Sequence, residues 1–277
     1  MKKKILLLLL LCSTAYGQWT GLKPFMGQQI NWGHSPVNGL VGCWMMNEGT
    51  GNLVNDLSGN GNTGILVADT HFVPGKFGSA LGFNGTSDYI NLGSNVSLRP
   101  ESMSYVIWLK LNDHADFGGL ISGDINNAYT YGFNALITNA EAINFYTRTG
   151  GSTNYFNAAV PALTVGLWTQ ITLTYDGITK SAYKNGILIG TNASATGPLE
   201  WGAISNIWIG KSLLSTAGKY FSGQIDHAMI YNRALTAYEV QQLYSEPFCM
   251  SSPSFDLMLY SAISVGVRVS QFILISN

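Results

Sequence analysis

Aromatic, amide and basic side chains with the chemistry to bind a sugar occur at three places in the sequence. Sugar rings stack on aromatic faces, and amide or charged groups hydrogen-bond to their hydroxyls. Tyr129 and Tyr131 are separated by one residue, so a strand would present both on the same side. The candidates at the other two places are Arg148, Asn154, Tyr155 and Trp201. These residues predict a ligand-binding rim if their segments meet.

The sequence has none of the common motifs for nucleophilic or zinc hydrolysis. It contains no Gly-x-Ser-x-Gly and no His-Glu-x-x-His. The Gly59-Asn60-Gly61 segment lacks the following Lys-Ser/Thr of a phosphate-binding loop. Four isolated histidines predict polar structural or surface residues: His34, His71, His114 and His227.

Composition limits the elements that could position these side chains. Of 277 residues, 46% are apolar and 10% are charged, whereas soluble domains usually carry about 25% charged residues. With 32 glycines and many Asn, Ser and Thr residues, the chain favours short strands and tight turns over helical bundles. It has no basic block outside its first residues, which argues against nucleic-acid and anionic-membrane partners.

Short apolar runs separated by turn residues predict a sandwich of antiparallel strands. Residues 105–111 alternate as a strand does, and Asn185-Gly186 between two such runs is a strong hairpin signal. Trp44, Trp108 and Trp168 lie inside strand patterns, as does Trp208, and are predicted to be core residues. The predicted strands are residues 40–46, 80–83, 88–92, 105–111, 131–137, 142–147, 168–175, 181–183, 187–190, 204–210 and 221–231.

One segment departs from the strand pattern. Thr236 and Glu239 form a capping box, with Leu235 and Val240 placed as a hydrophobic staple, and Pro247 ends the predicted helix. We expect this helix to cover an edge of the sandwich. The predicted organisation is a leader at 18–36, a sandwich at 37–247 and a tail at 248–277, which is either an incomplete β module or poorly ordered.

The first 17 residues have the pattern of a secretory signal peptide. Lys2, Lys3 and Lys4 precede a seven-residue apolar run, and Ala15-Tyr16-Gly17 is a small-x-small cleavage site. The run is too short to span a membrane, which needs about 20 residues. The sequence therefore predicts a secreted or extracytoplasmic protein with no membrane span.

Export affects the interpretation of the cysteines. After residue 17 only Cys43 and Cys249 remain, and an oxidising compartment would permit a disulfide between them. Such a bridge would tie the first strand to the last element. The alternative is a pair of free thiols.

Five ordered motifs resemble the laminin-G-like domains of the concanavalin A-like lectin/glucanase superfamily. The first is Gly-Leu-Val-Gly-Cys-Trp-Met-Met-Asn-Glu-Gly-Thr-Gly at 39–51, followed by Asp-Leu-Ser-Gly-Asn-Gly-Asn-Thr-Gly at 56–64. The others lie at 75–85, 168–186 and 223–235. This resemblance covers roughly residues 37–247. It implies an all-β jelly-roll sandwich of two antiparallel sheets, here with one short C-terminal helix.

The resemblance also bears on catalysis and metal binding. Glucan-hydrolysing members use closely spaced carboxylates on one strand, in a Glu-x-Asp pattern that none of the six glutamates here follows. The chain is therefore predicted not to be an enzyme. Many members hold a structural calcium ion, and calcium prefers six to eight oxygen ligands. At matching positions the candidate ligands are Glu48, Asp56, Asn60 and Asp226.

The sequence thus predicts an exported, non-catalytic module that binds carbohydrate or a cell-surface polymer. One alternative is a structural or adhesive sandwich that binds another protein. A third is an atypical polysaccharide hydrolase whose acidic groups meet only in the folded chain. An aromatic-lined groove, a flat apolar patch or a close acidic pair would distinguish the three.

Overall fold

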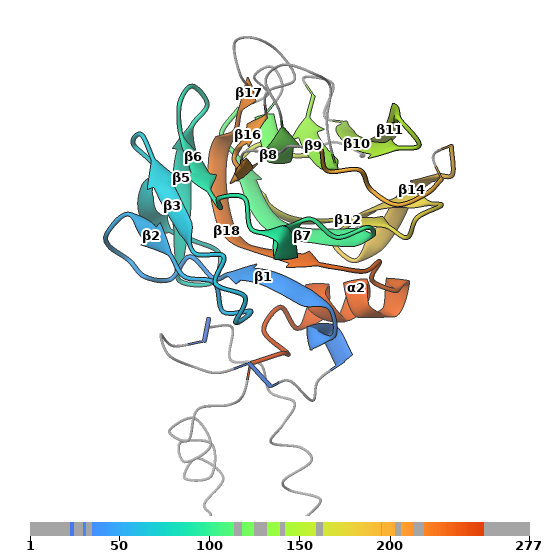
Figure 1. Cartoon of the computed structure of the whole chain (residues 1–277). Coiled ribbons are helices and arrows are strands. Elements are labelled where there is room, and N and C mark those ends of the chain that lie inside the picture. The colour runs from blue at the N-terminus through green and yellow to red at the C-terminus, as the bar shows by residue number, and fades with distance from the viewer. Residues whose placement is uncertain are drawn as a thin grey trace, which may run out of the picture.

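Two antiparallel sheets face each other in the computed structural model of the chain (Figure 1). The structure describes residues 23–24, 30–31, 35–113, 118–124, 132–138, 142–158, 163–194, 196–202, 206–212 and 219–251. The first sheet has the strand order β14-β13-β12-β7-β18-β5-β4, with β1 also paired to β18. The second sheet has the order β11-β10-β9-β8-β15-β6-β3-β2. The predicted all-β jelly-roll sandwich is confirmed.

The first sheet takes its strands from segments spread between residues 40 and 231. Its strands are β1 (Leu40–Trp44), β4 (His71–Pro74), β5 (Ser79–Asn84), β7 (Met103–Leu111), β12 (Trp168–Tyr175), β13 (Lys180–Lys184), β14 (Ile187–Asn192) and β18 (Ser222–Tyr231). Among the described residues, the helical elements are two short 3-10 helices, η1 (Ser35–Val37) and η2 (Val96–Leu98), and the helix α2 (Ala237–Ser245).

The second sheet is built mainly from the middle of the chain. Its strands are β2 (Leu53–Val54), β3 (Gly64–Val67), β6 (Tyr89–Asn91), β8 (Gly118–Asp124), β9 (Phe133–Ile137), β10 (Ile143–Thr149), β11 (Ser152–Ala158) and β15 (Asn206–Ile209). A separate two-stranded ribbon consists of β16 (Lys211–Ser212) and β17 (Lys219–Tyr220).

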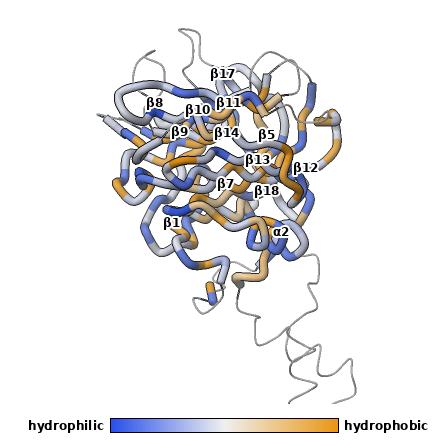
Figure 2. The backbone as a smooth tube through the Cα atoms, turned by 90° about the vertical axis from the view of Figure 1, so that its right-hand side faces the viewer, coloured by the Kyte–Doolittle hydropathy of each residue, from blue (hydrophilic) through white to orange (hydrophobic). Residues whose placement is uncertain are grey.

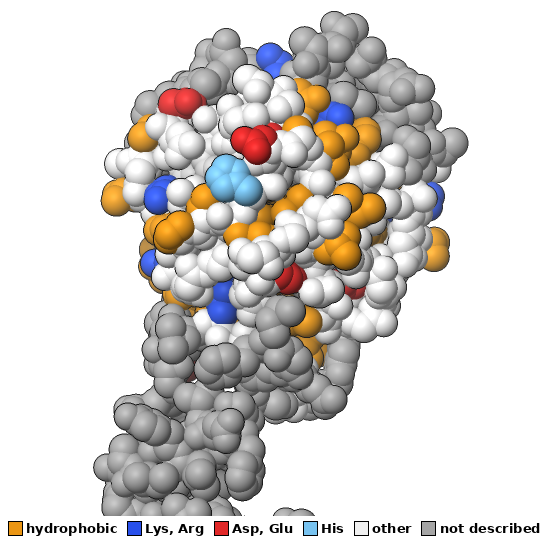
Figure 3. Space-filling view, turned by 90° about the vertical axis from the view of Figure 1, so that its left-hand side faces the viewer, with side chains coloured by type: hydrophobic (Ala, Val, Ile, Leu, Met, Phe, Trp, Pro, Cys, Tyr) orange, Lys and Arg blue, Asp and Glu red, His pale blue; other side chains and the backbone are white. Residues whose placement is uncertain are grey.

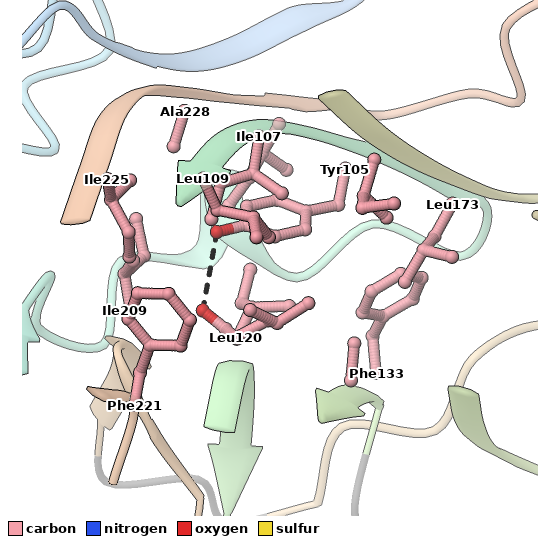
Figure 4. Packing of buried hydrophobic residues seen from close by; sticks show 14 of the residues in the cluster. Tyr105, Ile107, Leu109, Leu120, Phe133, Leu173, Ile209, Phe221, Ile225 and Ala228 are labelled. Atoms are coloured by element: carbon pink, nitrogen blue, oxygen red, sulfur yellow. Dashed lines mark hydrogen bonds between the residues drawn. The ribbon is translucent and has the colours of Figure 1, made fainter. Parts of the chain in front are cut away.

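The main core fills the space between the two sheets. Tyr105 of β7 faces β8, where its hydroxyl donates a hydrogen bond of 3.3 Å to the carbonyl of Leu120 (Figure 4). Phe133 of β9 lies with Leu173 of β12 in the same buried cluster. Hydrophobic segments accordingly run through the strands while the loops are more hydrophilic (Figure 2). Burial of this apolar surface is the main stabilising contribution to the sandwich.

A second hydrophobic cluster covers the outer side of the first sheet. On β7, Val106 and Trp108 point away from the main core and into this cluster. Val240 and Leu243 of α2 pack onto it, and the ring of Tyr244 stacks on Trp108 with centroids 5.7 Å apart. The helix therefore seals a sheet face, rather than only an edge.

Local signals for the helix and one hairpin are confirmed. Thr236 caps α2, because Glu239 N–H donates to its hydroxyl at 3.3 Å while the Glu239 carboxylate accepts from Thr236 N–H at 2.9 Å. In the turn between β13 and β14, Asn185 and Gly186 have φ values of 51° and 78°. Positive φ at both positions is what a tight hairpin of this twist requires.

The cysteines form no disulfide: both Cys43 and Cys249 are free thiols. Their side chains adjoin the second hydrophobic cluster. Burial raises the pKa of the Cys43 thiol well above its usual range and that of Cys249 to about 12. Both groups therefore stay protonated at neutral pH, in the form that does not attack another sulfur.

The predicted signal peptide, most of the leader and nearly all of the tail lie outside the described residues. Within the described part of the chain, no helix has the length and hydrophobicity needed to cross a membrane.

Candidate functional site

The outer face of the second sheet carries a row of residues that pair across successive strands. We call it the transverse row. Each residue of the row is paired in register with the next residue on the adjacent strand, from β11 to β3. In that order, the row consists of Tyr155, Tyr146, Asn134, Ser122, Trp208, Asn91 and Ile65. Adjacent strands lie about 4.8 Å apart, which places Tyr146 and Trp208 about 14 Å apart.

Strand alternation explains why this row faces away from the core. Phe145 and Ile209 are fully buried in the main cluster, so their neighbours Tyr146 and Trp208 point to the opposite side. The outer side of this sheet has no counterpart of α2 among the described residues. Figure 3 shows the side of the molecule where β2, β3 and β5 lie, with hydrophobic side chains among uncharged polar ones.

The ribbon β16–β17 covers the middle of the transverse row. Asn134 Nδ2 donates to Ser212 Oγ at 3.0 Å, and Ser122 Oγ donates to the carbonyl of Lys211 at 2.9 Å. Gly119 permits this contact, because a Cβ there would lie 2.4 Å from the backbone of β16. One aromatic region lies beside the ribbon, and a second forms where the ribbon meets β6 and β15.

The first region is the tyrosine pair, Tyr146 and Tyr155. Their ring centroids are 5.7 Å apart with planes inclined by 30°, and Tyr155 is 61% exposed. Arg148 lies two residues after Tyr146 on β10 and therefore on the same face. Its Nε is 3.5 Å from the Glu200 carboxylate. Its charge is therefore partly neutralised within the chain.

The second region is the aromatic platform, formed by Tyr89, Trp208 and Tyr220. The rings of Tyr89 and Trp208 meet edge to face at 6.4 Å, and those of Tyr89 and Tyr220 are 6.3 Å apart. The Lys211 ammonium lies over all three rings, at 4.2 Å, 4.8 Å and 5.5 Å from the centroids of Tyr89, Trp208 and Tyr220. Burial lowers the pKa of Lys211. The platform thus consists of three aromatic rings with the ammonium of Lys211 lying over them.

The predicted ligand-binding residues are only partly brought together. Arg148 and Tyr155 share the outer face of the second sheet, which we call the open face. Asn154 is on the other side of β11, where it pairs with Thr147 and points its amide toward Thr149. Tyr129 and Tyr131 lie outside the described residues.

Trp201 has a structural environment. Its indole N–H donates to the carbonyl of Pro100 at 2.6 Å, and the ring packs against the main core. A side chain at Gly132 would collide with the ring, since a Cβ there would lie 2.2 Å from it. The neighbouring backbone links Glu200 N–H to the carbonyl of Arg148 at 2.9 Å, so this segment supports the rim.

Sequence reasoning missed Tyr146 and the aromatic platform. Trp208 is buried as predicted, but it lies outside both hydrophobic clusters and belongs to the outer face. The signal was the alternation Ile207-Trp208-Ile209, which puts the tryptophan opposite two core residues. The same alternation around Ile90 places Tyr89 on the outer face.

The predicted calcium ligands in the first loop are engaged by the chain itself. The Asp56 carboxylate accepts N–H bonds of 2.9 Å from Cys43, Ser58 and Asn62. Glu48 accepts from the N–H of Asn55 at 2.7 Å.

The Asn60 amide donates to Ser58 Oγ at 3.1 Å. These bonds order the loop that follows β1.

The fourth predicted ligand, Asp226, lies in a buried ionic cluster on β18, on the outer side of the first sheet. It follows the core residue Ile225, so strand alternation points it away from the main core, and a β-bulge between Ile225 and His227 puts His227 on the same outer side. Lys23 Nζ lies 2.9 Å from its Oδ1, and Phe77 N–H donates to Oδ2 at 3.0 Å. Burial acts to raise the pKa of Asp226, but the His227 hydrogen bond and the Lys23 charge outweigh it and lower that pKa.

Within the part of the chain described, no three His, Cys, Asp or Glu side chains are grouped in a way that could hold a metal ion. The structure therefore does not gather Glu48, Asp56 and Asp226 at one point. Calcium binding stays a prediction.

The fold and family are shown by comparison with known proteins. A family model described as the concanavalin A-like lectin/glucanases superfamily matches residues 84–241, more than half of the chain. The chain therefore belongs to this superfamily. A comparison with curated protein sequences found no match.

Solved structures with the same fold include several binding domains. Domain 4 of AbnA, an extracellular arabinanase from Geobacillus stearothermophilus, solved with arabinotriose, is 18% identical with a TM-score of 0.59. The match covers 74% of this chain and 98% of that domain. Trypanosoma rangeli sialidase with sialic acid is 16% identical with a TM-score of 0.59, covering 78% of this chain and 34% of the sialidase.

The binding domain of botulinum neurotoxin DC with rat synaptotagmin II is 16% identical with a TM-score of 0.59. That match covers 75% of this chain and 51% of the toxin domain. The chain thus spans about half of the toxin binding domain and a third of the sialidase. At these identities the likeness establishes the fold.

Proposed function

We propose that this protein is an exported, non-catalytic module that binds carbohydrate through the open face of its second sheet. The transverse row carries the proposal. It places the rings of Tyr155 and Tyr146 and the amide of Asn91, all at least partly exposed, on one rigid face with Trp208, which is largely buried beside Tyr89. Aromatic surface for stacking and amides for hydroxyl recognition are the parts a sugar site needs.

The solved structures support a sugar ligand. The arabinanase domain, which matches this chain over nearly its whole length, was solved with arabinotriose. The sialidase was solved with sialic acid. A carbohydrate ligand for this chain agrees with both and with the chemistry of the open face.

The proposal of a non-catalytic module rests on the acidic residues. No two of the six glutamates lie within three residues of each other, so a carboxylate pair for glycoside hydrolysis has no support from spacing. Glu200 and Glu239 each form an ion pair with an arginine. Glu200 Oε2 is 3.5 Å from Arg148 Nε, and Glu239 Oε1 is 2.6 Å from Arg233 Nη2. Export rests on the signal-peptide pattern of residues 1–17.

A glycan array probed with the chain from Gln18 onward tests the proposal. Tyr155→Ala and Tyr89→Ala remove one ring from each aromatic region, and each should weaken binding to the recognised glycan about five- to tenfold. Tyr238→Ala is the matched control, because Tyr238 is 76% exposed but lies on α2. Thermal unfolding of every variant would show that it remains folded.

The outcomes separate the alternatives. Parallel arrays in calcium and in EDTA test the predicted cation, since loss of binding only in EDTA would support it. Absence of glycan binding by the folded protein would overturn the carbohydrate proposal. The protein-binding alternative would then rest on the exposed apolar residues Ile187 and Leu188 of the edge strand β14.

A further inference from the structure

We propose that the aromatic platform with Lys211 is a subsite for an acidic sugar, one that carries a carboxylate. This inference rests on the proposed carbohydrate-binding function and specifies its ligand class. The sugar carboxylate would accept hydrogen bonds from the Lys211 ammonium, and the sugar ring would pack beside it against the partly exposed rings of Tyr89 and Tyr220.

The ammonium of Lys211 has donors to offer. Lysine carries three N–H donors and no acceptor. Among the described residues, Lys211 Nζ has neither an ion pair nor a hydrogen bond, and its contacts are the three ring faces. The segment that joins β16 to β17, residues 213–218, contains no acidic residue. Among the described side chains, an incoming carboxylate would therefore meet no acidic group paired with this cation.

The other lysines that lie over aromatic rings have fewer ring partners. Lys110 Nζ lies 5.3 Å from the Trp168 centroid, and Lys76 Nζ lies over Phe77 and Trp108 at 5.2 Å and 4.7 Å. Both are on the side of the first sheet that the second hydrophobic cluster covers. The combination of three rings with an open face occurs, among the described lysines, at Lys211.

The platform is also rigidly held. Tyr89 and Trp208 come from adjacent strands whose neighbours Ile90 and Ile209 are fully buried. Lys211 begins β16, and the hydroxyl of Ser122 anchors this strand by donating a hydrogen bond to the Lys211 carbonyl. Strands held in this way keep the cation and the rings in one arrangement, which lowers the entropic cost of ligand binding.

Comparison of the two cations on the open face indicates which one takes the acid. Arg148 has the Glu200 carboxylate 3.5 Å from its Nε, so an anionic ligand there would also meet a negative charge. Lys211 has no such neighbour among the described residues. The carboxylate of the ligand is therefore assigned to the aromatic platform. The tyrosine pair would bind a neutral sugar unit of the same oligosaccharide.

Titration calorimetry with paired oligosaccharides tests this assignment on the chain from Gln18 onward. The pairs are sialyllactose with lactose and trigalacturonate with galactotriose. They separate a sialic acid ligand from a uronic acid ligand. We expect at least one acidic member to bind about tenfold more tightly than its neutral partner, as a charge-assisted hydrogen bond would give. Added salt should weaken this preference.

Substitutions at Lys211 give the second test. Lys211→Met keeps the aliphatic stem over the rings and removes the charge, so it should abolish the preference for acid while neutral binding persists. Lys211→Arg should retain the preference. Lys110→Met is the matched control at a lysine over a single ring on the other sheet, and should leave binding unchanged.

The results distinguish this inference from the proposed function. Equal binding of the acidic and neutral members, or an unchanged preference in Lys211→Met, would overturn the acidic subsite and leave carbohydrate binding intact. Failure of the folded protein to bind any oligosaccharide, on the array as well as in solution, would overturn both.

Discussion

The outer sides of the two sheets are both built from antiparallel strands, but they differ in what covers them. On the first sheet, Trp108 lies beneath Tyr244 of α2, and a buried ionic cluster joins Lys23 to Asp226. On the second sheet, Tyr146 and Trp208 point outward without a helix over them in the described chain. The first face adds a second hydrophobic core and therefore stability, while the second leaves aromatic surface exposed, with Tyr155 61% exposed.

The largest expected effect comes from breaking the sealed face at Asp226. Asp226→Ala removes the partner of Lys23, whose side chain is nearly fully buried, and leaves its charge uncompensated. We expect the free energy of unfolding in urea to fall by about 3–5 kcal/mol. Glu101→Ala, at an exposed acid, is the control and should change it little. A small, equal loss in both variants would show that the ionic cluster contributes nothing.

The open face should be most sensitive at Gly119. In Gly119→Ala the new Cβ would lie 2.4 Å from the β16 backbone, so the ribbon must move. We expect about 1–3 kcal/mol of lost stability and a weakened preference for acidic sugars, because Lys211 moves with β16. Gly82→Ala is the control in the first sheet, where the nearest atom is a Val73 methyl at 3.3 Å. Unchanged calorimetry in Gly119→Ala would mean that the ribbon does not position Lys211.

Acid should weaken the sealed face through His227. Burial lowers the pKa of His227, and the Asp226 hydrogen bond and charge offset this only in part. The unfolded chain, with a pKa near 6.5, therefore takes up the proton first as the pH falls. Stability from this group is present above pH 6.5 and is lost below it, down to the pKa in the folded state.

Urea unfolding at a series of pH values measures this effect. His227→Gln should flatten the decline below pH 6.5, whereas His71→Gln, at an exposed ring, should preserve it. A decline of the same slope in His227→Gln and the unaltered protein would exclude His227 as its source.

The smallest expected effect concerns the thiols beside the second cluster. Cys43 is fully buried, and burial raises the pKa of both cysteines. A thiol reagent at neutral pH should react slowly with the folded chain from Gln18 and should titrate two thiols once the chain is unfolded. Detection of no thiol after unfolding without a reductant would demonstrate the disulfide instead.

Local signals were sufficient for much of the fold. The capping box of Thr236 and Glu239 and the turn at Asn185-Gly186 were predictable because each depends on neighbours in sequence. The alternation in β7 was equally local, and Tyr105 and Ile107 lie in the main core as it predicted.

The candidate site was less accessible to such reasoning. Arg148 and Tyr155 were found from their side-chain types, but Asn154 was grouped with them although strand geometry puts it on the opposite side. Asp56 and Asp226 were chosen from a resemblance. Some of their partners are distant in sequence: Phe77 is 149 positions from Asp226, and Lys23 is 203 positions from it.

By itself the sequence determined the class of fold, the short helix, the main turns and the absence of spaced catalytic carboxylates, because these depend on residue type and local spacing. Only the tertiary structure decided which aromatic residues share a face. Tyr146 and Trp208 meet in one row because β10, β9, β8 and β15 pair in a particular register. Register between distant strands is set by the packing of both sheets around a common core, and a one-residue slip would turn either ring inward.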